Sequence, residues 1–187
     1  PDPTHQWFDV CWSPQLTRFV AVAEWTTTNN KRVMTSSDGI NWTSQTTTSH
    51  NWVSVCWSPQ LTRFVAVAYA FSNPTTDRVM TSSDGFTWAL QPGTQTNGWT
   101  QVCWSPLRSL FVAVADQGAY RIMTSSDGFT WAGSSQATSA EFRGVCWSQE
   151  AELFVGVCWN GATKVWTSSD GFNWTGSIPP EDNAWYD

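Results

Sequence analysis

The chain has 187 residues, of which 41% are hydrophobic and 13% charged, and its net charge at neutral pH is −6. The length and the apolar share suffice for one well-buried domain. Nine Lys and Arg without a basic run argue against a nucleic-acid partner. No stretch approaches the roughly 20 apolar residues of a membrane-spanning helix, so we expect no membrane insertion.

The five cysteines do not form a metal-binding pattern. Four of them share one position in a repeated VCWS string, and the sequence holds no CxxC pair and only two histidines. Zinc sites are built from closely spaced Cys and His ligands. We therefore expect buried thiols that act as small apolar residues, with no metal site and no cofactor.

A repeat of about 45 residues runs through the whole chain. The string VCWSPQLTRFVAVA occurs unchanged at 10–23 and 55–68, and two diverged copies begin at Val102 and Val145. A second motif follows in phase, as RVMTSSDG at Arg32 and Arg78 and in similar form twice more. Two motifs in phase over four copies predict four copies of one structural unit.

Each repeat contains four short extended segments. They are rich in Val, Phe, Trp and Thr, are separated by Pro, Gly, Asn and Ser, and show no long helical period. Four strands in about 45 residues predict a blade of an all-β propeller with four four-stranded antiparallel blades, and a solenoid is the rival architecture. We expect one domain over 1–187, with blades at about 7–51, 52–98, 99–141 and 142–184.

We expect the four blades to close into a ring. Residues 185–187 resemble the start of a further repeat. They are predicted to begin a longer array, to latch the ring, or to add to a neighbouring subunit.

The string SSDGxxW in each repeat resembles the Asp-box, also called the bacterial neuraminidase repeat, in a shortened form with Asp and Gly adjacent. The resemblance implies a propeller and a structural turn between the third and fourth strands. In such a turn the Asp carboxylate accepts backbone N–H groups and the Gly supplies a positive φ. The residues concerned are Asp38, Gly39, Trp42, Asp84, Gly85, Trp88, Asp127, Gly128, Trp131, Asp170, Gly171 and Trp174.

The same resemblance does not carry an enzymatic activity to this chain. Sialidases with Asp-boxes use a paired Tyr and Glu and an acid Asp on a separate loop, and none of these can be placed in this sequence. We therefore predict no catalytic residues and no enzyme.

The repeats differ mainly in two of their four connections. The connections between segments two and three and between successive blades vary, and antiparallel topology places both on one face. Aromatic and amide residues there suit sugars, and a basic residue follows each two–three loop. The structural alternatives are that the aromatic rings pack over the blade edges and that the basic side chains cap backbone carbonyls. The candidate ligand-binding residues are Trp25, Tyr69, Phe71, Tyr120, Trp159, Arg32, Arg78, Arg121 and Lys164.

The function that these features favour is a non-enzymatic, glycan-binding module. The alternative is a structural or adhesion subunit of a virion, fibre or cell-surface assembly, and a sialidase-like hydrolase ranks third. The expected partners are a glycan or a protein, with self-association through the terminal stub. The uncharged polar surface suggests an extracellular or virion-surface location.

Overall fold

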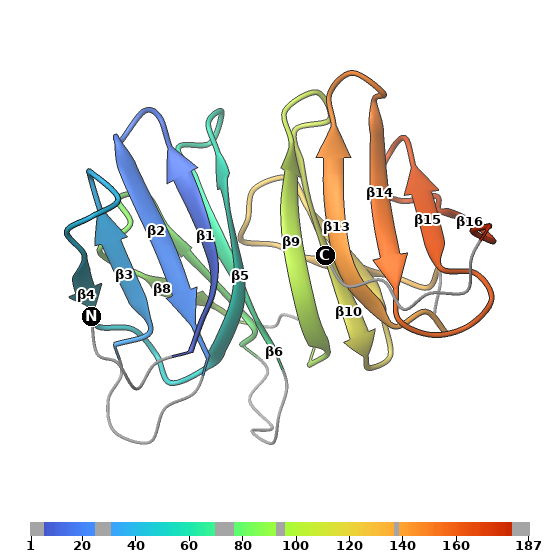
Figure 1. Ribbon diagram of the computed structural model, residues 1–187, viewed down its shortest axis with the longest axis horizontal. Helices are drawn as coiled ribbons and strands as arrows, with labels where there is room; N and C mark the ends of the chain where they lie inside the picture. The colour runs from blue at the N-terminus through green and yellow to red at the C-terminus, as the bar shows by residue number, and fades with distance from the viewer. Residues whose placement is uncertain (1–5, 25–30, 70–76, 93–95, 137–138, 181–187) are drawn as a thin grey trace.

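The described residues of the computed structural model are 6–24, 31–69, 77–92, 96–136 and 139–180, and they form four antiparallel sheets of four consecutive strands each. We number these sheets blades 1 to 4 (Figure 1). The innermost strands are β1 (Trp7–Ser13), β5 (Asn51–Ser58), β9 (Gly98–Ser105) and β13 (Phe142–Ser148). The second strands are β2 (Arg18–Ala23), β6 (Arg63–Tyr69), β10 (Leu110–Gln117) and β14 (Leu153–Cys158).

The outer half of each blade is shorter. The third strands are β3 (Val33–Ser36), β7 (Val79–Ser82), β11 (Ile122–Ser125) and β15 (Val165–Ser168). The outermost strands are β4 (Thr43–Gln45), β8 (Ala89–Gln91), β12 (Ala132–Ser134) and β16 (Thr175–Ser177). The predicted four-bladed all-β fold is therefore confirmed. No helix in the described part of the chain is long and apolar enough to cross a membrane.

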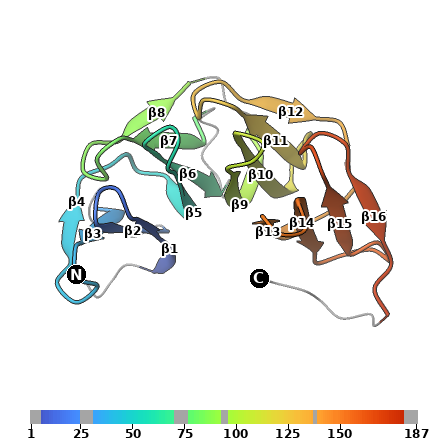
Figure 2. The same cartoon turned by 90° about the horizontal axis from the view of Figure 1, so that it is seen from above.

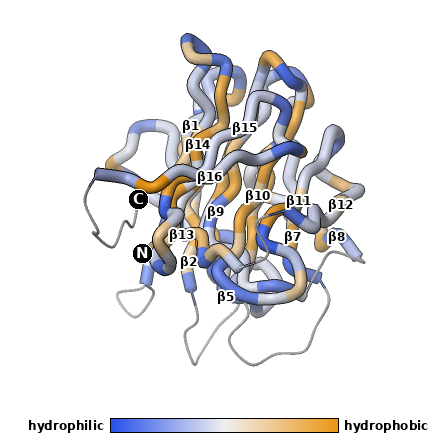
Figure 3. The backbone as a smooth tube through the Cα atoms, turned by 90° about the vertical axis from the view of Figure 1, so that its right-hand side faces the viewer, coloured by the Kyte–Doolittle hydropathy of each residue, from blue (hydrophilic) through white to orange (hydrophobic). Residues whose placement is uncertain are grey.

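The core lies between the blades, because both faces of each inner strand pair are apolar. Three separate clusters of buried side chains join blade 1 to blade 2, blade 2 to blade 3 and blade 3 to blade 4. Figure 3 shows hydrophobic colouring concentrated along the strands. The double-sided pattern of FVAVA thus follows from its place in a sheet covered on both sides.

The four blades form an open arc, so the closed ring expected from the sequence is wrong for the described residues. The inner strands pack in the order β1, β5, β9, β13. Blades 1 and 4 lie on opposite sides of the arc, with the gap between them (Figure 2). The interblade cores, filled with Trp and Phe side chains, set the angle between blades, and three such steps do not bring blade 4 round to blade 1.

The SSDG turns between the third and fourth strands have the hydrogen bonding that the sequence predicts. In blade 3, Asp127 Oδ1 accepts the N–H groups of Phe129 at 2.7 Å and Thr130 at 2.8 Å. Gly128 has a φ of 78°, and its carbonyl oxygen accepts Trp131 Nε1–H at 3.1 Å. The other three copies repeat this arrangement, which anchors each outermost strand.

These turns make stability sensitive to acid. Burial raises the pKa of Asp84, Asp127 and Asp170, but the N–H donors outweigh it, and the pKa is lowered in each, to about 2 for Asp170. For Asp38, hydrogen bonds from the Asn41 side chain and backbone lower the pKa. An unfolded Asp titrates near ~3.9. The stabilisation is therefore complete above about pH 4 and is lost as pH falls through the folded-state values.

We expect the denaturation midpoint in urea to fall steeply between about pH 4 and about pH 2. Asp127→Asn keeps an acceptor oxygen but removes one titrating group, so its midpoint should fall less steeply over this range. A variant with the same acid profile as the unmodified chain would contradict the assignment of acid sensitivity to these turns.

Candidate functional site

One repeat position on the loop face carries a different residue in every blade. The loop face is the end of the arc where the second strands finish, and it lies at the lower edge of Figure 1. Directly after the repeated segment FVAVA or its variants stand Glu24, Tyr69, Asp116 and Trp159. The surrounding strand is nearly constant, so the scaffold presents four different chemistries at equivalent points of the arc.

Asp116 lies at the centre of a polar cluster built from three blades. Its side chain is only 6% exposed. Its Oδ2 accepts hydrogen bonds from Tyr69 Oη of β6 at 2.9 Å and from Arg143 Nη1 of β13 at 2.8 Å. Gln117 Nε2 donates to Tyr69 Oη at 3.0 Å. Asp116 Oδ1 has no hydrogen-bond donor among the described residues.

The protonation states in this cluster follow from its burial. Burial raises the pKa of Asp116, although the Tyr69 hydrogen bond and the Arg143 charge oppose the shift. Burial, followed by the hydrogen bond to Asp116, raises the pKa of Tyr69 to about 12. Tyr69 is therefore a neutral donor near pH 7, and a phenolate nucleophile is disfavoured at this position.

Trp159 forms the exposed edge of the cluster. Its side chain is 40% exposed, and the Arg143 guanidinium carbon lies 5.7 Å from its ring centre. The Trp159 backbone N–H donates to the Glu141 carbonyl at 2.9 Å, and Glu141 N–H donates to Asn160 Oδ1 at 3.0 Å. The loop backbone thus fixes an aromatic face beside a cation and a buried acid. We call Tyr69, Asp116, Gln117, Arg143 and Trp159 the Asp116 cluster.

Of the other predicted aromatic residues, Tyr120 lies elsewhere. Its ring packs over Gly133 of β12, the outermost strand of blade 3, so closely that an added Cβ at Gly133 would lie 2.7 Å from Tyr120 Cγ. The Tyr120 carbonyl accepts Asn97 Nδ2–H. This is the edge-packing alternative raised by the sequence. Trp25 and Phe71 lie outside the described residues.

The predicted basic residues point to a structural role. Arg32, Arg78 and Lys164 are all less than 8% exposed. Arg32 Nη1 donates to the His50 carbonyl at 2.6 Å, Arg78 Nη1 to the Tyr69 carbonyl at 3.2 Å, and Arg121 Nη1 to the Gly118 carbonyl at 3.0 Å. Burial lowers the pKa of Arg32 and Arg78. The three arginines hold loop carbonyls, and the cation of the Asp116 cluster is Arg143.

Sequence reasoning missed Asp116, Gln117 and Arg143. A signal was present for Arg143, because Phe8, Val53 and Thr100 occupy its position in the other repeats. A single charge at an otherwise uncharged repeat position indicates a local partner. No group of three or more His, Cys, Asp or Glu suited to a metal occurs within the described ranges. The cluster offers an acid, a cation, two neutral polar groups and an aromatic face.

No protein-family model matches the chain, and no curated protein matches it in sequence. Solved structures do resemble it. The GH74 enzyme of Niastella koreensis has a TM-score of 0.72 at 17% identity, over 95% of this chain and 30% of that chain. Streptogramin B lyase has a TM-score of 0.71 at 9% identity, over 95% and 56%.

YCF48 from Cyanidioschyzon merolae has a TM-score of 0.64 at 16% identity, over 98% of this chain and 60% of that chain. The chain thus spans less than two thirds of each of these structures. They include an enzyme and a lyase by name, and at such identities the likeness concerns the fold alone. The chain therefore has a β-propeller fold, represented by four blades in an open arc.

Proposed function

We propose that the chain is a non-enzymatic binding module that takes a glycan on the loop face, at the Asp116 cluster. The observation that carries the proposal is the convergence of differing residues from blades 2, 3 and 4 on one buried carboxylate beside an exposed tryptophan. Loops and strand ends on a rigid scaffold are common places for binding.

The chemistry of the cluster suits a sugar. The exposed face of Trp159 offers an apolar surface for the C–H groups of a pyranose ring. Arg143 and Gln117 offer donors for ring hydroxyls, and the buried Asp116 carboxylate holds the Arg143 guanidinium in place. Arg143 also favours a sugar with a carboxylate, since guanidinium groups bind carboxylates in a bidentate way.

Binding to a glycan array, followed by calorimetry on the glycans that bind, tests the proposal. Trp159→Ala is expected to weaken binding by about 10-fold or more, because aromatic anchors dominate small interfaces. Phe172→Ala is the matched control, since Phe172 is a similarly exposed aromatic residue in an SSDG turn, at the opposite end of the blade. Equal effects of the two changes, or no glycan bound at all, would refute the proposal.

A hydrolase is the competing use of the same residues. Tyr69 donates a hydrogen bond to Asp116, a tyrosine–carboxylate contact with an Asp where sialidases have a Glu. The raised pKa of Tyr69 weighs against it as a nucleophile. Turnover of a fluorogenic sialoside by the unmodified chain, abolished in Tyr69→Phe, would favour this alternative over the binding module.

A further inference from the structure

All three junctions between blades are built from the same two surfaces. We define the leading face of a blade as the side toward the preceding blade, and the trailing face as the side toward the following one. The trailing face of blade 1 presents Cys11, Val20, Val22 and Val33. The leading face of blade 2 meets it with larger side chains, among them Trp52, Trp57, Met80 and Trp88.

This match of small aliphatic and large aromatic side chains recurs at both later junctions. Interiors are close-packed, so such a pair of surfaces is complementary in shape as well as in polarity. The repeat sequence therefore encodes one self-complementary junction, used three times within the chain.

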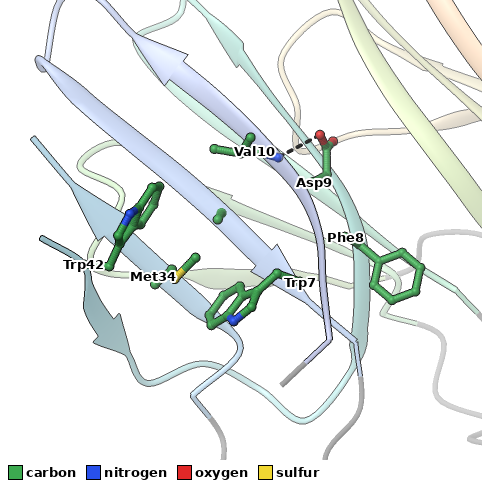
Figure 4. Close-up of a pocket in the computed structure, with 7 residues that line it drawn as sticks. Trp7, Phe8, Asp9, Val10, Met34 and Trp42 are labelled. Atoms are coloured by element: carbon green, nitrogen blue, oxygen red, sulfur yellow. Dashed lines mark hydrogen bonds between the residues drawn. The ribbon is translucent and has the colours of Figure 1, made fainter. Parts of the chain in front are cut away.

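Within the described part of the chain, the two ends of the arc each carry one uncovered half of this junction. On the leading face of blade 1, Val10 is 55% exposed, whereas Val55, Val102 and Val145 at the same repeat position are each 4% exposed. A hollow of about 350 Å³ opens there (Figure 4). Its lining residues are Trp7, Phe8, Asp9, Val10, Ala21, Met34 and Trp42.

The trailing face of blade 4 is uncovered in the same way. Cys146 is exposed, whereas Cys11, Cys56 and Cys103 at its repeat position pack against a following blade. Val155, Val157 and Val165 are partly exposed, although their counterparts in the other three blades are fully buried. Each end thus presents the surface that the other end lacks.

Polar contacts at the edge of the junction also match across the two ends. Trp57 Nε1 donates to Gln15 Oε1 at 2.8 Å, and Trp104 Nε1 donates to Gln60 Oε1 at 2.9 Å. The repeat position of Gln15 and Gln60 is occupied by Glu150 in blade 4, which is exposed and carries an acceptor oxygen. Trp12 of blade 1 stands at the donor position. Blade 4 of a second copy would therefore offer Trp12 an acceptor at the position that Trp57 and Trp104 use. Trp147 has Leu107 at this position and donates instead to Gln149 of its own blade.

A second polar contact of the junction differs at both ends of the arc, and the two differences compensate each other. Asp9, Ser54 and Gln101 accept the backbone N–H groups of Val55, Val102 and Val145 in the following blades. Blade 4 has Gly144 at this position and offers no such acceptor. The Val10 N–H does not need one, because Asp9 Oδ1 already accepts it at 2.8 Å (Figure 4).

The SSDG turns provide a third match. Arg18 and Arg63 place their guanidinium groups over Phe86 and Phe129 of the next blade. Blades 3 and 4 have Leu110 and Leu153 in place of these arginines, and blade 1 has Ile40 in place of the phenylalanines. Ile40 is 81% exposed. A cation would gain nothing from Ile40, whereas Leu153 would form an aliphatic contact with it.

We propose that a second copy of this chain docks the trailing face of its blade 4 on the leading face of blade 1. Two identical junctions of this head-to-tail kind then close a ring of eight blades from two copies. Head-to-tail interfaces form rings when the rotation closes, and eight blades lie within the usual range of about 4–8 for propellers.

The mass of the chain in solution tests this proposal, using light scattering after size-exclusion chromatography. We expect twice the chain mass of 20.9 kDa. Val10→Asp and Val155→Asp each place a charge in the junction and should weaken association by at least about 100-fold, leaving a monomer. Leu107→Asp, at an exposed apolar residue in a turn of blade 3, is the control and should remain dimeric.

Mixing the two monomeric variants identifies the orientation of the copies. A Val10→Asp chain keeps an intact blade 4, and a Val155→Asp chain keeps an intact blade 1, so the mixture should form a 1:1 dimer with one junction. Contact of blade 1 with blade 1 would instead leave Val155→Asp dimeric on its own and give no 1:1 dimer of the two variants in the mixture, which would overturn the head-to-tail proposal.

The thiol of Cys146 gives a readout that is independent of mass. Burial raises the pKa of Cys11, Cys56, Cys103 and Cys158, so Cys146 should be the fast-reacting thiol in the monomeric Val10→Asp chain. In the unmodified chain its reaction with a disulfide reagent should slow at least about 10-fold on association. A monomeric unmodified chain with a fast Cys146 would overturn the proposal, and a ladder of larger oligomers would overturn the closed two-copy ring.

Discussion

Trp104→Ala is expected to lower the free energy of unfolding by about 3–5 kcal/mol, and Trp12→Ala by less than about 2 kcal/mol. The two residues occupy one repeat position, inside the same string VCWSP. Each ring lies 4.4 Å, centre to centre, from a Phe of its own blade. They differ in exposure to solvent, since Trp104 is 7% exposed and Trp12 is 39% exposed.

The difference between the two variants isolates the contribution of a preceding blade. Trp104 packs with Val65 and Val67 of blade 2 and donates to Gln60, whereas Trp12 stands at the open end of the arc. Urea denaturation in the Val10→Asp background removes any contribution from association. Equal losses would mean that the Trp–Phe contact within one blade, and not the junction between blades, stabilises the fold.

The blades were predictable because the information for them is local and repeated four times. FVAVA with apolar residues on both faces requires cover on both sides, and the SSDG string determines its own turn through Asp127 and Gly128. The open arc was not predictable. The angle between blades depends on how Trp52 or Trp99 fills the junction, and no residue pattern within one repeat predicts that angle.

The candidate site was predictable only in part, for a related reason. The sequence locates the loop face, and with it Tyr69 and Trp159, by comparing the repeats. It offers Arg32 and Arg78 as cations but not Arg143, and in the structure Arg32 and Arg78 follow the loops in sequence but turn inward to backbone carbonyls. Asp116 and Arg143 lie 27 residues apart and belong to different blades, so only the fold brings them together.

Gly128→Ala is expected to lower the free energy of unfolding by about 2–5 kcal/mol, and Gly39→Ala by about 1–2 kcal/mol. Both glycines occupy the SSDG turn with nearly equal φ values of 78° and 74°, so the conformational strain of an alanine is the same. A Cβ on Gly128 would lie 3.1 Å from Arg63 Cδ and Val65 Cγ2 of blade 2, too close for ordinary contact.

On Gly39 the same Cβ would meet nothing closer than Phe19 Cε2 at 3.5 Å, which is an ordinary contact within blade 1, and no described residue of another blade lies against it. The excess loss in Gly128→Ala, measured by urea denaturation at neutral pH in the monomeric Val10→Asp background, is therefore the cost of forcing two blades apart. If the two losses were equal, the turns would depend on backbone conformation alone. A large excess would instead show that the SSDG turn of each blade is fitted against the blade before it, and that the turn of blade 1 has room for a partner there.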